Sequence, residues 1–370
     1  MNKKQSLSGK GFLHGLKEDY QLWIMVLPAI VILFIFNYIP MYGIQLAFRD
    51  FDFTKGLTGG KWAGLKYFKM YFESPMFIPT IKNTFVLAAT SVIFGFPAPI
   101  FMALLFNQIR NQKAKKGMQT LVYMPYFIST VVLVALIQIL LSPNNGIVSH
   151  ALKALGLVQK DTNLVGSPAT FVPVYVISGI WQSCGWNSII YIAALSSVDT
   201  QLYDAAKIDG ASRAGIVWHI DLPALIPTIV ILLIMNMGSI LTVAFEKAFL
   251  MQNDLNRAVS EVISTYTFRI GLRSNQYSLG AAIGLFNTLC FLFCQTKYPK
   301  KSAISVCFRR RTMSNGFRNF FSRSISDIIF DLFVVILCIL IFIIIAYPLY
   351  FIVIASFSNA QYVSQGKVVF

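Results

Sequence analysis

Long apolar stretches separated by short polar segments dominate the chain. Seven of these stretches have about 20 residues or more, the length that an α-helix needs to cross a hydrocarbon core about 30 Å thick. Within lipid each backbone N–H and C=O group must find its partner in its own segment, so the stretches are predicted to be helices. The short alternating segments of a transmembrane barrel are missing from the sequence. The predicted spans cover residues 22–46, 79–106, 120–141, 171–197, 223–250, 277–296 and 328–356.

Composition agrees with a bilayer as the main solvent of this chain. Of its 370 residues, 56% are hydrophobic and 12% are charged, against roughly 45–50% apolar and 25% charged in soluble domains. The predicted fold class is therefore an all-α integral membrane protein, a polytopic helix bundle. We do not interpret the first span as a signal peptide, because its apolar run is too long and no small-residue cleavage site follows it promptly.

Basic residues gather in alternate polar segments. The formal net charge is +16, but no platform of interleaved aromatic residues accompanies it, so topology explains this charge better than nucleic acid binding does. The positive-inside rule places the N-terminus in the cytoplasm. The clusters are Lys3, Lys4, Lys10 and Lys17 before the first span, Arg110, Lys113, Lys115 and Lys116 after the second, and Arg309, Arg310, Arg311, Arg318 and Arg323 before the last.

This topology divides the chain into four parts. A cytoplasmic arm (1–21) precedes a six-span unit (22–296), which is followed by a basic cytoplasmic tail (297–327) and an extra span (328–370). Segments 49–74 and 142–170 are expected outside the cell. The first carries an aromatic stretch, 61–68, which fits either an interfacial belt or a docking surface for an external protein. Four prolines within or beside spans are expected to break helices: Pro97, Pro99, Pro125 and Pro227.

Side chains for catalysis or metal binding form no recognisable pattern. The three histidines, His14, His150 and His219, lie far apart, and Gly59-Gly60-Lys61 lacks the earlier glycine of a phosphate-binding loop. We therefore expect no enzyme activity, no metal site and no cofactor. Neither paired nor ligand-like spacing relates the five cysteines, Cys184, Cys290, Cys294, Cys307 and Cys338.

One inner segment, 199–223, is acidic where the others are basic. Over residues 199–221 four aspartates oppose one lysine and one arginine, a net charge of −2. A segment without an excess of basic residues is not explained by the positive-inside rule, and binding to a soluble partner is another explanation for its position inside the cell. Asp199 or Thr200 can cap a short helix there. Its Ala205-Ala206 pair favours a helix, and the small alanine side chains allow another protein to approach that helix closely. Gly210 can end the helix in the left-handed conformation.

The same segment resembles the coupling-loop signature of permeases in binding-protein-dependent ABC importers. That signature begins with an acidic residue followed by Ala-Ala. A glycine follows after three intervening residues, and after nine more residues the signature ends with Ile, any one residue, and Leu-Pro. An aspartate here replaces the usual glutamate. The residues that match the ATPase-coupling loop are Asp204, Ala205, Ala206, Gly210, Ile220, Leu222 and Pro223.

Shorter motifs resemble the maltose-type carbohydrate permeases, especially their six-span oligosaccharide branch, over residues 10 to about 288. They are Leu27-Pro28-Ala29, Asn37-Tyr38-Ile39-Pro40, Gly64-Leu65-Lys66-Tyr67-Phe68 and Asn83-Thr84. The resemblance implies a type I ABC importer permease fold in a bacterial cell membrane, with sugar or oligosaccharide import as the function. It implies four kinds of partner: a second homologous permease, two ATP-binding cassette subunits, an extracytoplasmic sugar-binding protein and membrane lipid.

Polar and flat aromatic side chains inside spans are candidates for the substrate path. Polar groups within a bilayer are expensive and usually face a cavity, and a tryptophan offers a flat surface to a pyranose ring. For Asn236, a hydrogen bond between helices is an equally good explanation. The candidates are Gln182, Trp186, Asn187, Asn236 and Glu246, with Trp181 as a further flat side chain.

Two other functions stay open from the sequence. An importer permease for a non-sugar solute would carry the same coupling loop. A secondary transporter independent of ATP would normally show a relay of acidic residues within spans, and Glu246 is nearly the only one here.

The end of the chain departs from the family pattern. After about Thr288 the sixth span continues into a basic run, and Met313 begins what reads as a fresh N-terminus followed by a seventh span. The seventh span, with Tyr347-Pro348-Leu349-Tyr350, resembles the first span of the partner permease. We interpret 297–370 as a fusion caused by a reading-frame change near residue 288, with a genuine regulatory tail as the alternative.

Overall fold

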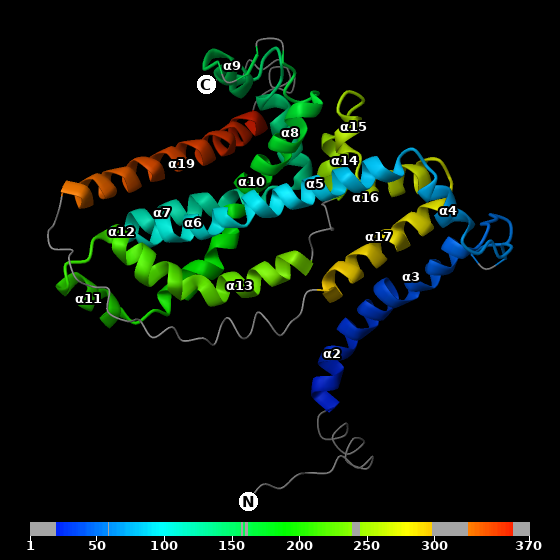
Figure 1. Ribbon diagram of the computed structural model, residues 1–370, viewed down its shortest axis with the longest axis horizontal. Coiled ribbons are helices and arrows are strands. Elements are labelled where there is room, and N and C mark those ends of the chain that lie inside the picture. The colour runs from blue at the N-terminus through cyan, green and yellow to red at the C-terminus, as the bar shows by residue number, and fades with distance from the viewer. Residues whose placement is uncertain are drawn as a thin grey trace, which may run out of the picture. The chain divides into compact units, whose positions relative to one another are not determined.

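A computed structural model describes residues 20–57, 59–156, 158–159, 162–238, 245–297 and 325–357 (Figure 1). In these residues the chain is helical, and its extended backbone pairs only in two isolated bridges, Arg49 with Trp62 and Asp52 with Gly56. The predicted all-α fold class is confirmed. The basic clusters before the first and last spans lie outside the described residues, as do Thr58, Cys307 and Met313.

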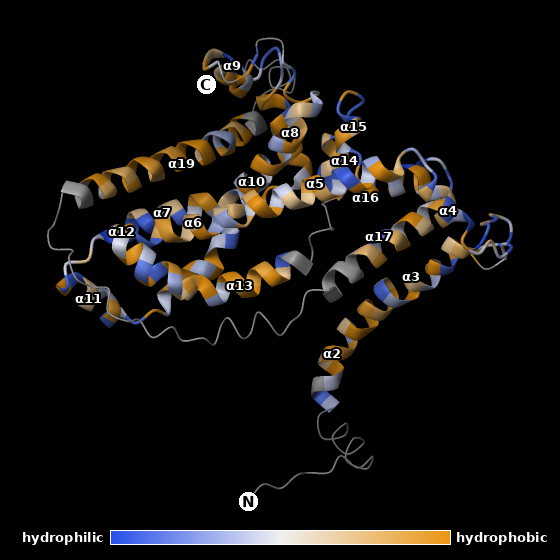
Figure 2. Cartoon of the chain, in the orientation of Figure 1, coloured by the Kyte–Doolittle hydropathy of each residue, from blue (hydrophilic) through white to orange (hydrophobic). Residues whose placement is uncertain are grey.

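The chain forms two compact units. The first combines residues 1–74 with 267–286, and the second combines 75–266 with 287–370. Apolar residues cover the long helices of both, while hydrophilic residues gather in α11 (Thr200–Ile208) and in the connecting segments (Figure 2).

In the first unit the N-terminal span is helical throughout. It runs through α2 (Tyr20–Leu33), a π turn (Phe34–Tyr38), α3 (Ile39–Met41) and a 3-10 turn (Tyr42–Phe48). Proline at position 40 cannot donate a backbone hydrogen bond, and the wider π turn before it absorbs that loss. No part of the most apolar window in 23–48 is buried within this chain.

The rest of the first unit packs α4 (Lys66–Phe72) with the start of α17 (Tyr277–Lys297). Ala47, Phe68 and Ala282 form its buried core. A π turn (Arg269–Arg273) leads into α17; the helix before it, α16 (Ile263–Phe268), belongs mostly to the second unit. A Cβ on Gly280 would lie 2.6 Å from the Cα of Gly271, so this close approach requires glycine.

The second unit is built around α10 (Pro168–Ser196), which packs against α5 (Phe77–Gly95), α6 (Pro97–Asn107) and α7 (Gln112–Tyr123). A Cβ on Gly185 would collide with the carbonyl oxygen of Val122, so glycine allows α10 to approach α7. The remaining elements are α8 (Thr130–Leu140), α9 (Ile147–Ala154), α12 (Arg213–Ile216), α13 (Leu222–Gly238), α14 (Phe245–Met251), α15 (Arg257–Ser260) and α19 (Ile325–Phe357).

Where they are described, the seven predicted spans are helical apart from short interruptions such as Ile128 and Ser129. Within the part of the chain that the structure describes, four helices are long and apolar enough to cross a membrane: 23–48, 77–107, 213–236 and 332–354. The predicted span 120–141 is not one straight helix, because α7 with its 3-10 extension (Met124–Phe127) meets α8 at a bend of 100°. Counted as one broken span, this pair is a fifth. The helices α10 and α17 match predicted spans in position, but by length and composition they fall outside this set.

Two of the four prolines expected to break helices lie where an α-helix is interrupted. Pro125 lies in the 3-10 turn at the bend between α7 and α8. Pro97 begins α6 directly after the turn at Phe96, although residues 77–107 remain one span. Pro99 in α6 and Pro227 in α13 lie inside helices, so that expectation was wrong for these two. One missing hydrogen bond does not interrupt a span when neighbouring elements support the freed carbonyl groups.

The last helix, α19, lies along α6 and α7 (Figure 1). Val334 and Cys338 are buried against Leu105 of α6. About two turns after Cys338, Ile345 is buried against Met102 and Phe106. The face of α19 turned away from α6 and α7 is apolar and exposed.

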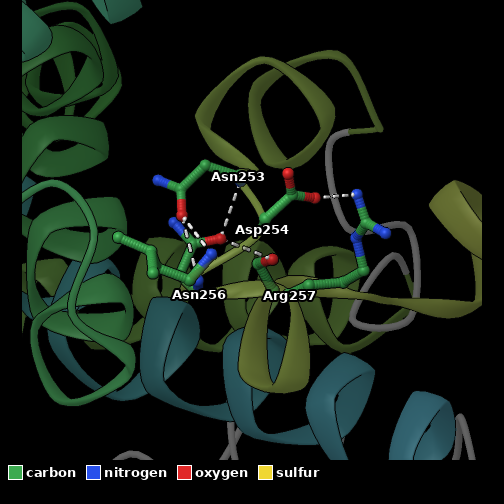
Figure 3. Close-up of polar contacts among 6 residues, drawn as sticks. Asn253, Asp254, Asn256 and Arg257 are labelled. Carbon is green, nitrogen blue, oxygen red and sulfur yellow. Dashed lines mark hydrogen bonds and ion pairs between the residues drawn. The ribbon is translucent and has the colours of Figure 1, made fainter.

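A hydrogen-bonded turn joins α14 to α15 (Figure 3). The side chain of Asn256 is fully buried, and its oxygen accepts hydrogen bonds from the backbone N–H of Asn253 and the hydroxyl of Ser260, both at 2.9 Å. Its amide donates to the carbonyl oxygens of Met251 and Val165 at 3.1 and 3.3 Å. This turn therefore fixes the end of α14 to the segment that precedes α10.

Candidate functional site

The acidic segment forms the short helix that its sequence predicts. The side chain of Asp199 caps α11 by accepting a hydrogen bond from the backbone N–H of Gln201 at 2.9 Å. At the other end Gly210 is left-handed, with a φ of 72°. The N–H of Ala211 donates to the carbonyl oxygen of Ala206 at 2.8 Å, and that of Gly210 donates to Lys207 at 3.1 Å. This pair of bonds is the Schellman closure, which favours glycine at the left-handed position.

Most side chains of α11 are exposed. Asp204 and Ala205 lie on its open surface, and the carboxylate of Asp204 pairs with Lys207 at 3.0 Å, whereas Ala206 is buried. Leu202 and Ile208 are also open, the latter 83% exposed. A helix with small and apolar side chains on its open face can insert into a cleft on another protein.

The second half of the motif lies in a continuous helix. Ser212 caps α12 through the N–H of Gly215, and a π turn (Val217–Asp221) connects α12 to α13. Ile220, Leu222 and Pro223 are half-buried at this junction. Because proline lacks a donor, the π turn before Pro223 has the same explanation as the one before Pro40.

Sequence reasoning missed Asp221, which lies between two of the matched residues. Its carboxylate is fully buried and accepts a hydrogen bond of 2.7 Å from the hydroxyl of Tyr203 on α11. The amides of Asn107 and Gln108, at the end of α6, donate to the same carboxylate at 3.2 and 3.1 Å. Burial, together with the hydrogen bond to Asp221, raises the pKa of Tyr203 to about 12, so its hydroxyl keeps the proton that it donates. The available signal was an acidic residue just before the Leu-Pro that begins an apolar stretch.

Three of the five substrate-path candidates lie close together on α10, near the bend between α7 and α8. Trp186 stacks on Tyr126 with ring centroids 4.8 Å apart and planes 6° apart, and Phe127 meets Trp186 edge-on at 5.5 Å. Gln182 donates to the carbonyl oxygen of Ile128 at 2.9 Å, which fixes the bend to α10. Asn187 is exposed beside Trp186. We call the side chains of Tyr126, Phe127 and Trp186 the aromatic platform.

The other two candidates belong to different helices. Asn236 on α13 donates to the carbonyl oxygen of Leu232 in its own helix at 2.9 Å. Glu246 is exposed on α14. The structure does not bring either of them into a described contact with the aromatic platform.

A lysine within the fifth predicted span was also missed. Lys247 on α14 is 6% exposed, and its Nζ donates to the carbonyl oxygen of Tyr175 at 2.7 Å. The same Nζ lies 4.6 Å from the centroid of the Tyr175 ring. A basic residue in an apolar stretch was the available signal. Among the residues that the structure describes, no group of three or more His, Cys, Asp or Glu side chains could hold a metal ion.

Known proteins resemble this chain along most of its length. The profile of the family described as binding-protein-dependent transport system inner membrane component matches residues 95–296. The polygalacturonan/rhamnogalacturonan transport system permease protein YteP of Bacillus subtilis (strain 168) is 40% identical, over 75% of this chain and 86% of that protein.

Solved structures resemble the fold as well. A chain of a bacterial ABC transporter involved in the import of the acidic polysaccharide alginate superposes with a TM-score of 0.71 and 36% identity, covering 81% of this chain and 99% of that one. A chain of a bacterial alginate ABC transporter in complex with an alginate pentasaccharide-bound periplasmic protein gives a TM-score of 0.68 and 37% identity, covering 76% and 94%.

The matched region contains α11, its glycine closure and the Ile-x-Leu-Pro junction in the order that the motif requires. The same region contains the broken span and the aromatic platform. Transport proteins of this kind are not enzymes, and their dependence on a binding protein argues against a secondary transporter. The chain therefore belongs to the inner membrane components of binding-protein-dependent transport systems, the permease subunits of ABC importers.

Proposed function

We propose that this permease carries oligosaccharides into the cytoplasm and receives the energy of ATP hydrolysis through α11. The observation that supports this role is the form of α11, a capped helix with an open face of small and apolar side chains. Its residues occupy the positions of the coupling-loop signature. The N-terminus is then cytoplasmic, and segments 49–74 and 142–170 face outward.

The aromatic platform supports a saccharide as the substrate. Trp186 lies ten residues before the end of α10, roughly 15 Å along the helix axis. A second measure from the same, cytoplasmic side, along α7 from Gln112 to Tyr126, is about 20 Å by the same rise per residue. In a hydrocarbon core about 30 Å thick, both paths place the platform near mid-depth. Substrate sites at broken helices near the midplane are a recurring arrangement in transporters.

The chemistry of the platform suits a pyranose ring. The C–H groups on one face of a sugar ring can pack on a flat aromatic surface, while its hydroxyl groups need amide partners. Gln182, one helical turn before Trp186, donates to Ile128 at the bend, and Asn187 is exposed on the same helix. The relatives named above belong to a polygalacturonan/rhamnogalacturonan transport system and to a transporter involved in alginate import, so oligosaccharides of uronic acids are the first substrates to test.

Assembly with other subunits is part of the proposal. A second, homologous permease would complete the pathway, two ATPase subunits would each receive one coupling helix, and an external binding protein would deliver the saccharide. Closure of the ATPases would move α11 and tilt the two bundles between outward and inward openings as rigid bodies.

Reconstitution in proteoliposomes tests this function. The complete importer, with binding protein and labelled oligogalacturonate or oligoalginate outside, should accumulate sugar only when ATP is enclosed with the ATPases. A neutral oligosaccharide of equal length serves as the comparison substrate. ATPase subunits with an inactivated phosphate-binding lysine are the control. Accumulation that continues with the inactive ATPases would reject the proposal.

A further inference from the structure

Asp221 lies where three helical segments of the second unit meet. Its side chain belongs to the π turn that leads into α13, and its hydrogen-bond donors come from α11 and from the end of α6. One carboxylate oxygen accepts from Tyr203 and Asn107, and the other accepts from Gln108. A single buried side chain therefore connects α11 to two long helices of the bundle.

Neutral donors alone hold this carboxylate. Asp221 is fully buried and forms no ion pair with the residues that the structure describes. A buried carboxylate that loses a donor pays the cost of an unsatisfied charged group, which exceeds the cost for a neutral one. The buried carboxylate is therefore satisfied only while the hydroxyl of Tyr203 and the amides of Asn107 and Gln108 all keep their positions around it.

The hydrogen bond from Tyr203 to Asp221 connects a side chain of α11 to another part of the second unit. Within the described part of the chain, no other side chain of α11 donates a hydrogen bond to a residue beyond that helix. Lys207 pairs with Asp204 inside α11, and Ala206 contributes only a small buried surface. A displacement of α11 therefore strains the hydrogen bond from Tyr203 to Asp221. Asp221 precedes α13 and is hydrogen-bonded to the end of α6, so both helices are connected to this movement.

We propose that Asp221 is a positioning residue that transmits movement of α11 to the transmembrane bundle, with Tyr203 as its contact on α11. The inference rests on the proposed role of α11 as the coupling helix. It adds a residue that the coupling-loop signature does not include. It also assigns the hydrogen-bonded partner through which α6 and α13 would respond to the ATPases.

Two substitutions test the link. Tyr203→Phe removes one donor and keeps the ring, and Asp221→Asn keeps the shape but turns an amide N–H₂ toward groups that are themselves donors. Tyr191→Phe is the matched control, because Tyr191 is a buried tyrosine packed with Ala103 and Leu225 whose hydroxyl has no hydrogen-bond partner in the described region. Each variant is assembled with its partner subunits in proteoliposomes. Hydrogen exchange of residues 200–209 and sugar transported per ATP hydrolysed are then measured.

We expect Tyr203→Phe to speed exchange in α11 on the order of tenfold, the effect of losing one hydrogen bond of about 1.4 kcal/mol. Transport per ATP should fall in the same variant, and Asp221→Asn should exceed it in both effects. Tyr191→Phe should match the wild type. Wild-type exchange, or wild-type transport per ATP, in both Tyr203→Phe and Asp221→Asn would overturn the inference. If Asp221→Asn does not assemble, Tyr203→Phe decides alone.

Gly210→Val separates this inference from the function on which it rests. If that variant uncouples ATP hydrolysis from transport while Tyr203→Phe and Asp221→Asn behave as wild type, the role of Asp221 is rejected and that of α11 stands. If Gly210→Val transports normally, the proposed role of α11 is itself rejected.

Discussion

The indole of Trp186 and the phenol of Tyr126 stack with centroids 4.8 Å apart, joining α10 to the bend between α7 and α8. Both side chains are open, Trp186 to 38% and Tyr126 to 44% of their surfaces. The rings are parallel and stacked, so Tyr126 fixes the orientation of the indole, and the exposed part of Trp186 can present one flat face. Its proposed function as a sugar contact leads to the first prediction.

Trp186→Ala should weaken the sugar contact while leaving the fold intact. Stacking of this kind contributes about 0.5–1.5 kcal/mol, so the apparent KM for uptake should rise by about two- to tenfold. Trp186→Tyr, which keeps a flat ring on Tyr126, should remain close to the wild type. Uptake rates against substrate concentration measure both. An unchanged KM in Trp186→Ala would remove the platform from the substrate path.

The left-handed backbone of Gly210 leads to a second prediction. Valine at a φ of 72° is strained by about 1–2 kcal/mol, so Gly210→Val should open the end of α11 and lower the ATP hydrolysis that substrate stimulates. Asparagine tolerates this conformation, and Gly210→Asn is therefore the matched control, expected to retain most of the stimulation. The two variants should bind the loaded binding protein equally well. Equal stimulation in both would show that the glycine closure does not matter for coupling.

Sequence patterns predicted local elements of this protein better than contacts between distant ones. Asp199, Ala206 and Gly210 lie within a stretch of twelve residues, so propensity and capping rules specify α11 without reference to the rest of the fold. The hydrogen bond from Tyr203 to Asp221 depends instead on how α11 folds back on α13, and the donors of Asn107 and Gln108 come from more than a hundred residues away. The periodicity of one sequence does not predict hydrogen bonds between residues so far apart in the chain.

The same distinction explains the errors about the spans. Apolar length identified residues 120–141 as membrane-embedded, but the 100° bend depends on Gln182 of α10 binding the carbonyl of Ile128. Proline was a poor guide to breaks, since Pro227 continues a helix while Pro125 marks one end of the bend. Whether a freed carbonyl finds support depends on its neighbours in space.

The outward position of segment 142–170 is a third prediction. Asn145 is exposed in that segment, and Ile208 is exposed on α11. In a variant stripped of its native cysteines, Asn145→Cys should react with a membrane-impermeant maleimide in intact cells. Ile208→Cys should react only after lysis. The reverse pattern would invert the topology, and Thr58→Cys provides a second outward site.

The buried amide of Asn256 gives a fourth prediction, which concerns stability. Asn256→Ala leaves the N–H of Asn253 and the hydroxyl of Ser260 without their shared acceptor (Figure 3). Losing buried hydrogen bonds of this kind costs about 1–3 kcal/mol. Asp254→Ala removes only an exposed ion pair with Arg257 and should change little. Thermal unfolding of the detergent-solubilised complex should show a lower midpoint for Asn256→Ala alone, and equal midpoints would contradict this account of the turn.

The last prediction concerns the chain after Lys297. If 297–370 is a fused fragment of a neighbouring permease, truncation after Lys297 should leave uptake unchanged or improve it. The contacts of α19 do not argue against this, although Val334, Cys338 and Ile345 are buried on α6 and α7. If α19 is removed in a bilayer, lipid acyl chains can cover the apolar face of α6 and α7 that it contacted. The deletion then exposes no hydrophobic surface to water and loses mainly van der Waals packing. In a soluble protein the same deletion would be severe.

Two measurements decide between the fusion and a genuine tail. Sequencing of the locus should show a change of one or two bases near the codon of residue 288. Uptake by the truncated permease, assembled with its partners, should equal or exceed that of the full chain. Val334→Asn and Cys338→Asn provide an independent probe, because polar groups at this contact should loosen α19 without shortening the chain, and they should reproduce the truncation. An unbroken reading frame together with loss of uptake on truncation would establish α19 as a functional part of the permease.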